Sequence, residues 1–207
     1  VRKSRVLQAK IPSPQVISNE FLLVSGKELN RYNYFIEQGD FMSKIQFTIR
    51  QAVADDITKI AEVEEKCFPP SEAATIKSFF ERFMAFPECF LVAEADGKVV
   101  GHINGCVTDV PKLSDALYHN TALHMPEAPW QTVFGIAVLP EYQRQGIARA
   151  LMGKFKEETK NRGKKGIILT CKDEKIGFYE SLGFTYDGVS ASSHGGARWN
   201  DMILKFS

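Results

Sequence analysis

A single glycine, Gly146, stands between a strand pattern and a long helix pattern, and this junction strongly constrains the fold. Residues 132–139 are apolar enough for a strand that Pro140 ends, and residues 144–162 show helical spacing with Gly163 just past the end. A glycine at such a junction lets the backbone approach a ligand, and the helix behind it presents unpaired N–H groups and the positive end of its dipole. The junction therefore predicts a pyrophosphate site in a mixed α/β protein.

Taken alone, the junction leaves an ordinary tight strand-to-helix turn equally open. Two other phosphate-binding patterns are excluded. A dinucleotide-binding loop needs Gly-x-Gly-x-x-Gly after an early strand and an acidic residue about 20 positions later, and a Walker-type loop needs Gly-Lys-Ser/Thr. The sequence contains neither pattern.

Strand and helix patterns alternate from residue 45 onward, and Asp96-Gly97 is a strong signal for a two-residue hairpin turn. The expected strands are residues 45–50, 90–94, 99–107, 132–139, 167–171 and 202–206. The expected helices are residues 57–68, 72–83, 144–162 and 175–182, the first capped by Asp55 or Asp56 and the second by Ser71. This order predicts a layered α/β protein.

Composition favours one globular domain without a polyanionic partner. The chain has 207 residues, of which 44% are apolar and 25% charged, enough for one domain with a real core. Its 26 basic and 25 acidic residues give a net charge of +1, so no overall field attracts nucleic acid or an anionic membrane surface.

The apolar runs and the cysteines exclude two further classes. The longest runs, such as residues 90–93, are far short of the ~20 residues needed to cross a bilayer. The four cysteines occur singly, and the four histidines do not join them at metal-ligand spacing, so no metal site is expected. A reducing, cytoplasmic location is the expectation.

The first 45 residues differ from the rest of the chain, because Pro12 and Pro14 interrupt any regular pattern. We expect an N-terminal extension over residues 1–45 and one domain over residues 46–207. Two interpretations of the extension stay open. Either Met42 is the native start and the preceding residues are extra, or the extension packs on the domain or on a partner.

The run from Val133 to Ala148 resembles the fourth strand and following helix of the GCN5-related N-acetyltransferase (GNAT) superfamily, whose signature is Arg/Gln-x-x-Gly-x-Gly/Ala. The resemblance begins near Phe47 and reaches the C-terminus. It implies one domain with a central, mixed, twisted sheet of six to seven strands, flanked by about four helices, and acetyl-CoA as co-substrate. The residues it implies for binding acetyl-CoA are Ile136, Ala137, Val138, Arg144, Gln145, Gly146, Ile147, Ala148 and Arg149.

Acetyl transfer to an amine needs a deprotonated amine, a stabilised oxyanion and a proton for the leaving thiolate. Tyr179 is the candidate general acid, because a phenol with a pKa near ~10 keeps its proton at neutral pH. The alternative is that Tyr179 is only a core aromatic of a short helix. Backbone N–H groups near Gly135, where the family has a β-bulge, are expected to meet the oxyanion.

Three segments, residues 64–73, 117–126 and 178–184, resemble the arylalkylamine branch of the superfamily, the group related to serotonin N-acetyltransferase. Substrate contacts are accordingly expected from Phe68, Pro69, Thr132 and Phe134. The vertebrate enzymes of that branch have two histidines on the fourth strand in a proton path, where this chain has Thr132 and Phe134. The base is therefore unassigned, with a water chain touching Thr132 or Glu72 as one route.

The leading hypothesis is transfer of an acetyl group from acetyl-CoA to the primary amine of a small arylalkylamine or polyamine-like molecule. Two alternatives stay open: acetylation of a protein N-terminus or lysine, and a CoA-binding module without catalysis. His124 and Cys171 are left out of the catalytic set, since an isolated histidine or cysteine in such a context is more often structural. A monomer or homodimer is expected.

Overall fold

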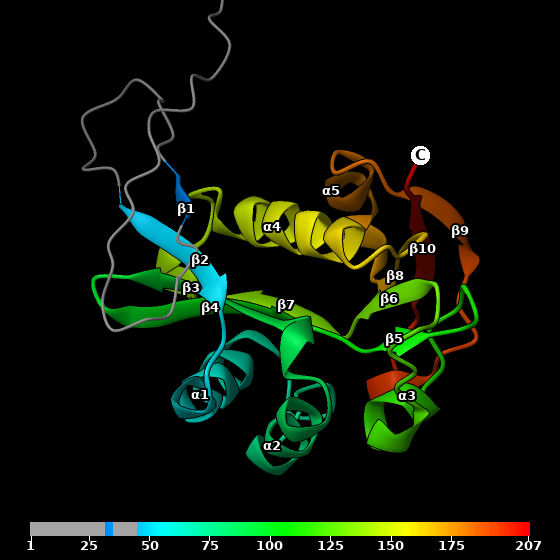
Figure 1. The fold of residues 1–207 in the computed structure, drawn as a ribbon, viewed down its shortest axis with the longest axis horizontal. Helices are drawn as coiled ribbons and strands as arrows, with labels where there is room; N and C mark the ends of the chain where they lie inside the picture. The colour runs from blue at the N-terminus through cyan, green and yellow to red at the C-terminus, as the bar shows by residue number, and fades with distance from the viewer. Residues whose placement is uncertain (1–31, 35–44) are drawn as a thin grey trace, which may run out of the picture.

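The computed structural model describes residues 32–34 and 45–207, and Figure 1 shows two adjoining sheets with helices on either side. The first sheet has the order β1 (Tyr32–Tyr34), β2 (Phe47–Gln51), β3 (Phe90–Ala95), β4 (Lys98–Asn104) and β7 (Gly135–Val138). The second has the order β5 (Val107–Thr108), β6 (Trp130–Val133), β8 (Gly166–Cys171), β10 (Asn200–Lys205) and β9 (Thr185–Val189). The helices are α1 (Ile57–Cys67), α2 (Ile76–Ala85), α3 (Ala116–His119), α4 (Ile147–Asn161) and α5 (Ile176–Glu180).

The expected mixed α/β fold is confirmed, but the expected central sheet divides in two. The predicted strand over residues 132–139 is interrupted at Phe134, between β6 and β7. The Phe134 N–H donates to Asn104 O at 2.8 Å, and Asn104 is also the partner of Gly135, so two residues face one across the ladder. This local irregularity lies where the resemblance implied a bulge.

The division separates two strands that would otherwise be neighbours. Strand β6 pairs in parallel with β8 up to Val133 and Leu169, whereas β7 pairs antiparallel with β4. Among the described strands β7 has no second partner, so its other edge faces a gap that opens beside β8. This gap positions the candidate site.

Hydrophobic cores lie on both faces of the first sheet. Helix α4 covers one face, where Leu151, Met152 and Phe155 are fully buried, and α1 and α2 cover the other, where Ile60 and Phe79 are fully buried (Figure 1). The predicted hairpin between β3 and β4 is present, with Asp96 and Gly97 both at positive φ, as the turn requires.

Two helices begin later than predicted. Helix α2 starts at Ile76 rather than after Ser71, because the Thr75 hydroxyl accepts from Ser78 N–H at 3.1 Å and is the actual cap. Helix α4 starts at Ile147 rather than at Arg144, because Gly146 has a left-handed φ of 81°. The exposed strand β9 was not predicted, since its residues show no alternation.

Part of the predicted extension joins the first sheet. Strand β1 pairs antiparallel with β2, with Tyr34 opposite Phe47. Residues 32–34 therefore belong to the sheet edge rather than to a separate segment. Met42 and the prolines of the extension lie outside the described residues.

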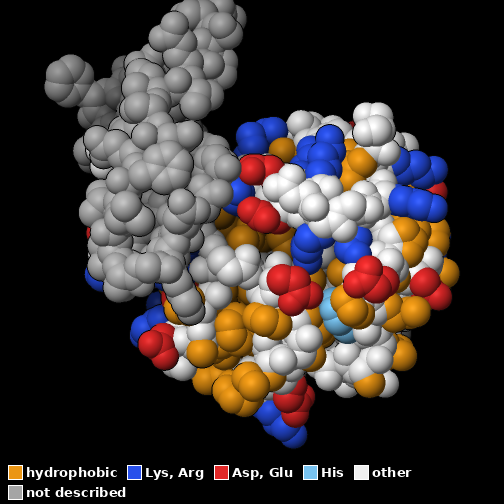
Figure 2. Space-filling model, viewed as in Figure 1, with side chains coloured by type: hydrophobic (Ala, Val, Ile, Leu, Met, Phe, Trp, Pro, Cys, Tyr) orange, Lys and Arg blue, Asp and Glu red, His pale blue; other side chains and the backbone are white. Residues whose placement is uncertain are grey.

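Apolar side chains gather at the surface over α2, as Figure 2 shows on the lower edge of the molecule. Ile76, Phe80 and Met84 are 52%, 57% and 67% exposed. None of the described helices combines the length and the apolar character that a membrane crossing requires.

Candidate active site

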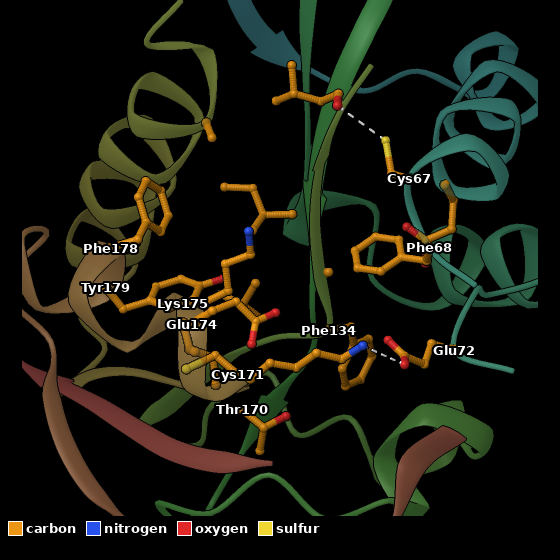
Figure 3. A pocket seen from close by; sticks show the side chains of 18 of the residues that line it. Cys67, Phe68, Glu72, Phe134, Thr170, Cys171, Glu174, Lys175, Phe178 and Tyr179 are labelled. Atoms are coloured by element: carbon orange, nitrogen blue, oxygen red, sulfur yellow. Dashed lines mark hydrogen bonds and ion pairs between the residues drawn. The ribbon is translucent and has the colours of Figure 1, made fainter. Parts of the chain in front are cut away.

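A cleft of about 750 Å³ opens where β7 and β8 part. Its walls come from the end of α1 and the loop after it, from β7 and the start of α4, from the end of β8 and α5, and from residues 194–199. Figure 3 shows Cys67 and Phe68 on one wall and Phe178 and Tyr179 on the opposite wall. The cleft thus collects segments from most of the chain.

Strand β7 offers backbone groups to this cleft. The Leu139 N–H donates to Val100 O at 2.9 Å, and the groups of an antiparallel strand point alternately to either side. The backbone groups of Ala137 therefore face β4, and those of Ile136 and Val138 face the cleft. Ile136 and Val138 line it, whereas Ala137 does not.

The carbonyl of Val138 confirms this orientation. It accepts from Gln143 Nε2 at 2.9 Å and from the Cys67 thiol at 3.2 Å, and both side chains belong to the cleft wall. The groups of this strand edge that an extended, amide-containing ligand can bind, as a further strand would, are therefore those of Ile136 and the Val138 N–H.

The start of α4 forms a cradle for an anion at the end of this row. Gly146 has a φ of 81° and Arg144 a φ of 61°, so the turn directs successive backbone N–H groups outward at the N-terminus of a 15-residue helix. Gly146, Ile147 and Ala148 line the cleft together with both Arg144 and Arg149. These are the expected positions apart from Gln145, whose Nε2 instead donates to Glu141 O at 3.3 Å.

Tyr179 on α5 lines the same cleft and is only 8% exposed. Its ring packs edge-to-face against Phe178 and Phe184, with centroid distances of 5.1 and 5.7 Å. Burial raises the pKa of Tyr179, and the neighbouring Cys171 and Tyr118 raise it further, so the phenol keeps its proton at neutral pH. The side chain is thus a packed aromatic with a protonated phenol in the cleft wall.

The sequence of residues 56–184 matches the Acetyltransferase (GNAT) family. The chain belongs to this family. It is 45% identical over 56 residues to the [Ribosomal protein bS18]-alanine N-acetyltransferase of Escherichia coli strain K12, which covers 26% of this chain and 38% of that protein. The chain spans about 40% or less of the length of the first curated relatives it matches.

Solved GNAT structures share the fold. A GphF GNAT-like decarboxylase in complex with isobutyryl-CoA aligns with a TM-score of 0.67 at 16% identity, over 76% of this chain and 98% of that one. The yncA protein of Salmonella typhimurium, a putative acetyltransferase with its cofactor acetyl-CoA, aligns with a TM-score of 0.57 at 19% identity, over 78% and 94% of the two chains. At these identities the likeness concerns the fold alone.

The other half of this GNAT cleft is lined by aromatic side chains. Phe68, Pro69 and Phe134, all predicted to contact substrate, lie in its wall. The Tyr118 ring lies between Phe134 and His194, with centroid distances of 4.9 and 4.7 Å. The result is an aromatic wall built from four separate segments.

An ion pair closes this half of the GNAT cleft. Lys172 Nζ lies 2.7 Å from Glu72 Oε1, joining the loop after α1 to the segment after β8. The His194 ring contacts the Glu72 backbone oxygen at 3.0 Å, and Lys172 lies 5.7 Å from the Trp199 ring. These contacts tie the loop to the opposite wall.

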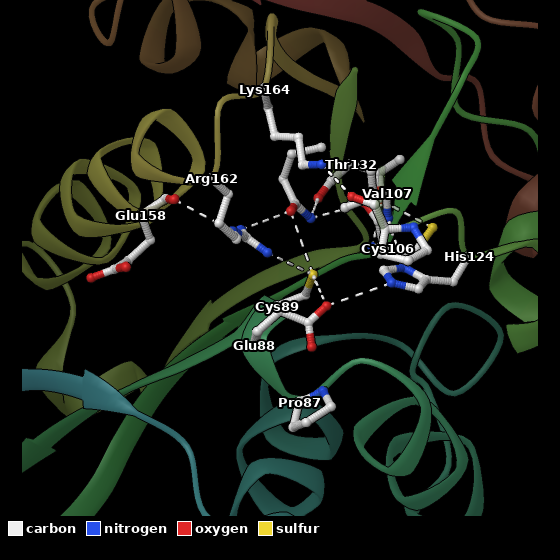
Figure 4. A network of polar contacts seen from close by, with 12 residues as sticks. Pro87, Glu88, Cys89, Cys106, Val107, His124, Thr132, Glu158, Arg162 and Lys164 are labelled. Carbon is white, nitrogen blue, oxygen red and sulfur yellow. Dashed lines mark hydrogen bonds and ion pairs between the residues drawn. The ribbon is translucent and has the colours of Figure 1, made fainter. Parts of the chain in front are cut away.

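Thr132, the fourth predicted substrate residue, lies outside the cleft. It is fully buried in β6, where its hydroxyl accepts from Cys106 N–H at 2.9 Å and donates to Cys106 O at 3.1 Å (Figure 4). His124 also lies outside the cleft wall, and its Nδ1 accepts from Val107 N–H at 3.1 Å. The strand break turns Thr132 into the second sheet, away from the site.

Sequence reasoning missed a buried carboxylate on α1. Glu64 is 5% exposed and borders the cleft. Its Oε1 accepts from Ala74 N–H at 3.2 Å, and its Oε2 lies 3.2 Å from His102 Nε2. The spacing of residues along the helix could have predicted that Glu64 is buried, because Glu64 falls on the same helical face as Ile57 and Ile60.

Proposed function

We propose that this chain transfers the acetyl group of acetyl-CoA to the primary amine of a small aromatic molecule. The observation that carries the proposal is the pairing, in one cleft, of a pyrophosphate cradle with an aromatic wall that the Glu72–Lys172 ion pair closes. The first feature selects the donor and the second selects the acceptor.

The donor half fits acetyl-CoA by its chemistry. The N–H groups after Gly146, with Arg144 and Arg149 beside them, suit the pyrophosphate. The cleft-facing groups of Ile136 and the Val138 N–H suit the amides of the pantetheine arm. This arrangement directs the thioester along β7 toward Phe134 and Tyr179.

Tyr179 then acts as the general acid. The amine nitrogen attacks the thioester carbonyl carbon, the C–S bond breaks, and the Tyr179 phenol gives its proton to the leaving thiolate. The buried phenol is protonated across the neutral range, so this proton is available at each turnover.

The acceptor half fits a small aromatic amine better than an extended peptide. Phe68, Phe134 and Tyr118 offer ring faces and edges to an aryl group. The ion pair between Glu72 and Lys172 crosses the end of the aromatic wall, where a peptide chain would need an open groove.

Thiol release from acetyl-CoA tests the proposal with a panel of 2-phenylethylamine, tryptamine, spermidine and short peptides. We expect the aromatic amines to give a kcat/KM at least tenfold above that of the peptides and spermidine. Failure of every amine to release thiol between pH 7 and pH 9 would reject the activity.

A protein N-terminus is the second candidate acceptor. The support is the 45% identity over 56 residues to an enzyme whose name gives the alanine of ribosomal protein bS18 as its target. A peptide beginning with Ala belongs in the panel for this reason. A higher kcat/KM for that peptide than for the aromatic amines would favour a protein acceptor.

A further inference from the structure

A buried carboxylate borders the acceptor half of the cleft, and one of its oxygens makes no hydrogen bond within the described residues. Glu64 Oε1 is held by the Ala74 N–H. Glu64 Oε2 is shielded from solvent, and its polar neighbour is His102 Nε2 at 3.2 Å, a contact that does not form a hydrogen bond. A buried polar atom without a partner is unfavourable unless a ligand or water supplies one.

The position of Glu64 matches the place where an acceptor nitrogen must arrive. A Cβ built on Gly135 would lie 3.6 Å from Glu64 Oε2 and 3.8 Å from Oε1. Gly135 begins β7, and the next residue, Ile136, is the first of the strand whose backbone groups face the cleft. The carboxylate therefore lies over the start of the strand edge, beside Phe134.

His102, on strand β4, contacts the Glu64 carboxylate. It is fully buried in β4, with Nε2 3.2 Å from Glu64 Oε2 and Nδ1 3.5 Å from Asn104 Nδ2. Phe79 packs against its ring edge-to-face at 5.5 Å. Asn104 Oδ1 likewise has no hydrogen bond in the described part of the protein. Glu64, His102 and Asn104 therefore each have a buried polar atom without a hydrogen bond.

The other charged or titratable groups near Glu64 come from the helices. Arg82 on α2 acts on it electrostatically, but its Nη2 donates to Tyr118 O at 2.9 Å and its guanidinium lies 4.8 Å from the Phe134 ring centroid. Cys67 lies one turn along α1, and its thiol donates to Val138 O. Neither group is hydrogen-bonded to Glu64 Oε2.

We propose that Glu64 is the general base that takes a proton from the acceptor ammonium, and that His102 positions it. Glu72, also in the cleft wall, is already paired with Lys172 at 2.7 Å and is less free to accept a proton. Glu64 and His102 would thus take the place of the two histidines that the vertebrate arylalkylamine enzymes have at the positions of Thr132 and Phe134.

The proton balance is complete with these groups. The ammonium gives one proton to Glu64, forming an O–H bond, and the freed nitrogen lone pair attacks the thioester carbon. The C–S bond breaks, Tyr179 protonates the thiolate, and the amide nitrogen loses a second proton that restores the phenol through solvent. Glu64 finally releases its proton to solvent, so each turnover yields one amide, one thiol and one proton.

This role rests on the proposed acetyl transfer, and the test separates the two. The probes are 2-phenylethylamine and its β,β-difluoro analogue, whose electron-withdrawing fluorines lower the ammonium pKa so that less help from a base is needed. For Glu64→Gln at pH 7 we expect kcat to fall about 100-fold with 2-phenylethylamine, the usual scale for general-base loss, but less than about 10-fold with the difluoro amine. The Kd for acetyl-CoA should stay within twofold.

Two further variants complete the test. Glu65→Gln, at an exposed position on the same helix, should match the wild type with both amines. For His102→Ala we expect an intermediate loss that is again larger with the more basic amine, and for His102→Gln, which offers an amide N–H beside Glu64, partial recovery of that loss.

The outcomes divide clearly. No turnover by the wild type would reject the proposed function and this role with it. Wild-type turnover with equal losses for both amines in Glu64→Gln would reject the role of Glu64 alone. A selective loss with 2-phenylethylamine in Glu72→Gln but not in Glu64→Gln would assign the base to Glu72 instead.

Discussion

The two halves of the cleft are built in different ways. The donor half consists of the edge of β7 and the turn at Gly146, which are adjacent in the chain and present mainly backbone groups. The acceptor half is made of side chains from distant segments, such as Glu72 and Lys172, which lie 100 positions apart. The donor half therefore depends on local backbone conformation, and the acceptor half depends on how the two sheets pack.

The difference has a functional meaning. A co-substrate common to a family can be bound by backbone groups, because these survive changes of side chain. An acceptor that differs among relatives needs side chains that can vary without loss of the fold. The comparison predicts that changes in the two halves alter different kinetic constants.

The largest effect is expected where the halves meet, at Tyr179. Tyr179→Phe should lower kcat at least ~100-fold while leaving the Kd for CoA within twofold, because only the proton donor is removed. Steady-state kinetics and calorimetry with CoA measure the two quantities. An equal loss of CoA binding would show that Tyr179 is structural.

The pH dependence of the wild type offers a second measure of Tyr179. Burial raises the pKa of this phenol, so the acid form persists above the usual tyrosine value of ~10. We therefore expect no loss of kcat from Tyr179 ionisation between pH 7 and pH 9.5. A fall in kcat across that range that is absent in Tyr179→Phe would contradict the assignment.

The next effect concerns the donor half alone. Gly146→Val should raise the Kd for CoA roughly 30-fold, since holding valine at positive φ costs about 2 kcal/mol. Gly153→Ala, in the middle of α4 with open space at the added Cβ, is the matched control and should leave Kd unchanged. Comparable CoA binding by Gly146→Val and the wild type would refute the cradle.

A smaller effect is expected in the acceptor half. Lys172→Met removes the partner of Glu72 and should raise the KM for the aromatic amine about fivefold, on the scale of a partly exposed ion pair. The Kd for CoA should not change. Lys98→Met, at the exposed hairpin turn, is the control. If Lys172→Met altered only CoA binding, the division into two halves would be wrong.

The smallest effect on activity is expected at Thr132. Thr132→Val removes hydroxyl hydrogen bonds to Cys106 and should lower the free energy of unfolding by about 1–2 kcal/mol, with an unchanged acceptor KM. Denaturant unfolding and steady-state kinetics measure both. A changed acceptor KM without lost stability would show that Thr132 contacts the acceptor.

Several features of the fold could be predicted from sequence because they depend on neighbouring residues. Asp96-Gly97 specifies its own turn, and the Gly146 junction specifies a helix start that can hold an anion. Gly146, Arg144 and residues of the flanking strand accordingly lie together in the cleft wall. The exact residues at which helices start were harder to predict. Thr75 and Ser71 are both plausible caps, and only the surrounding turn selects Thr75.

Local sequence determined the donor cradle, whereas only the tertiary structure decided the composition of the acceptor half. The break at Phe134 sent Thr132 into the second sheet and left Phe134 in the cleft, because strand pairing with β4 and β8 is a long-range choice. The same packing brought Glu64 of α1 against His102 of β4. No local pattern encodes that contact, since it arises only when helix and strand bury their faces together.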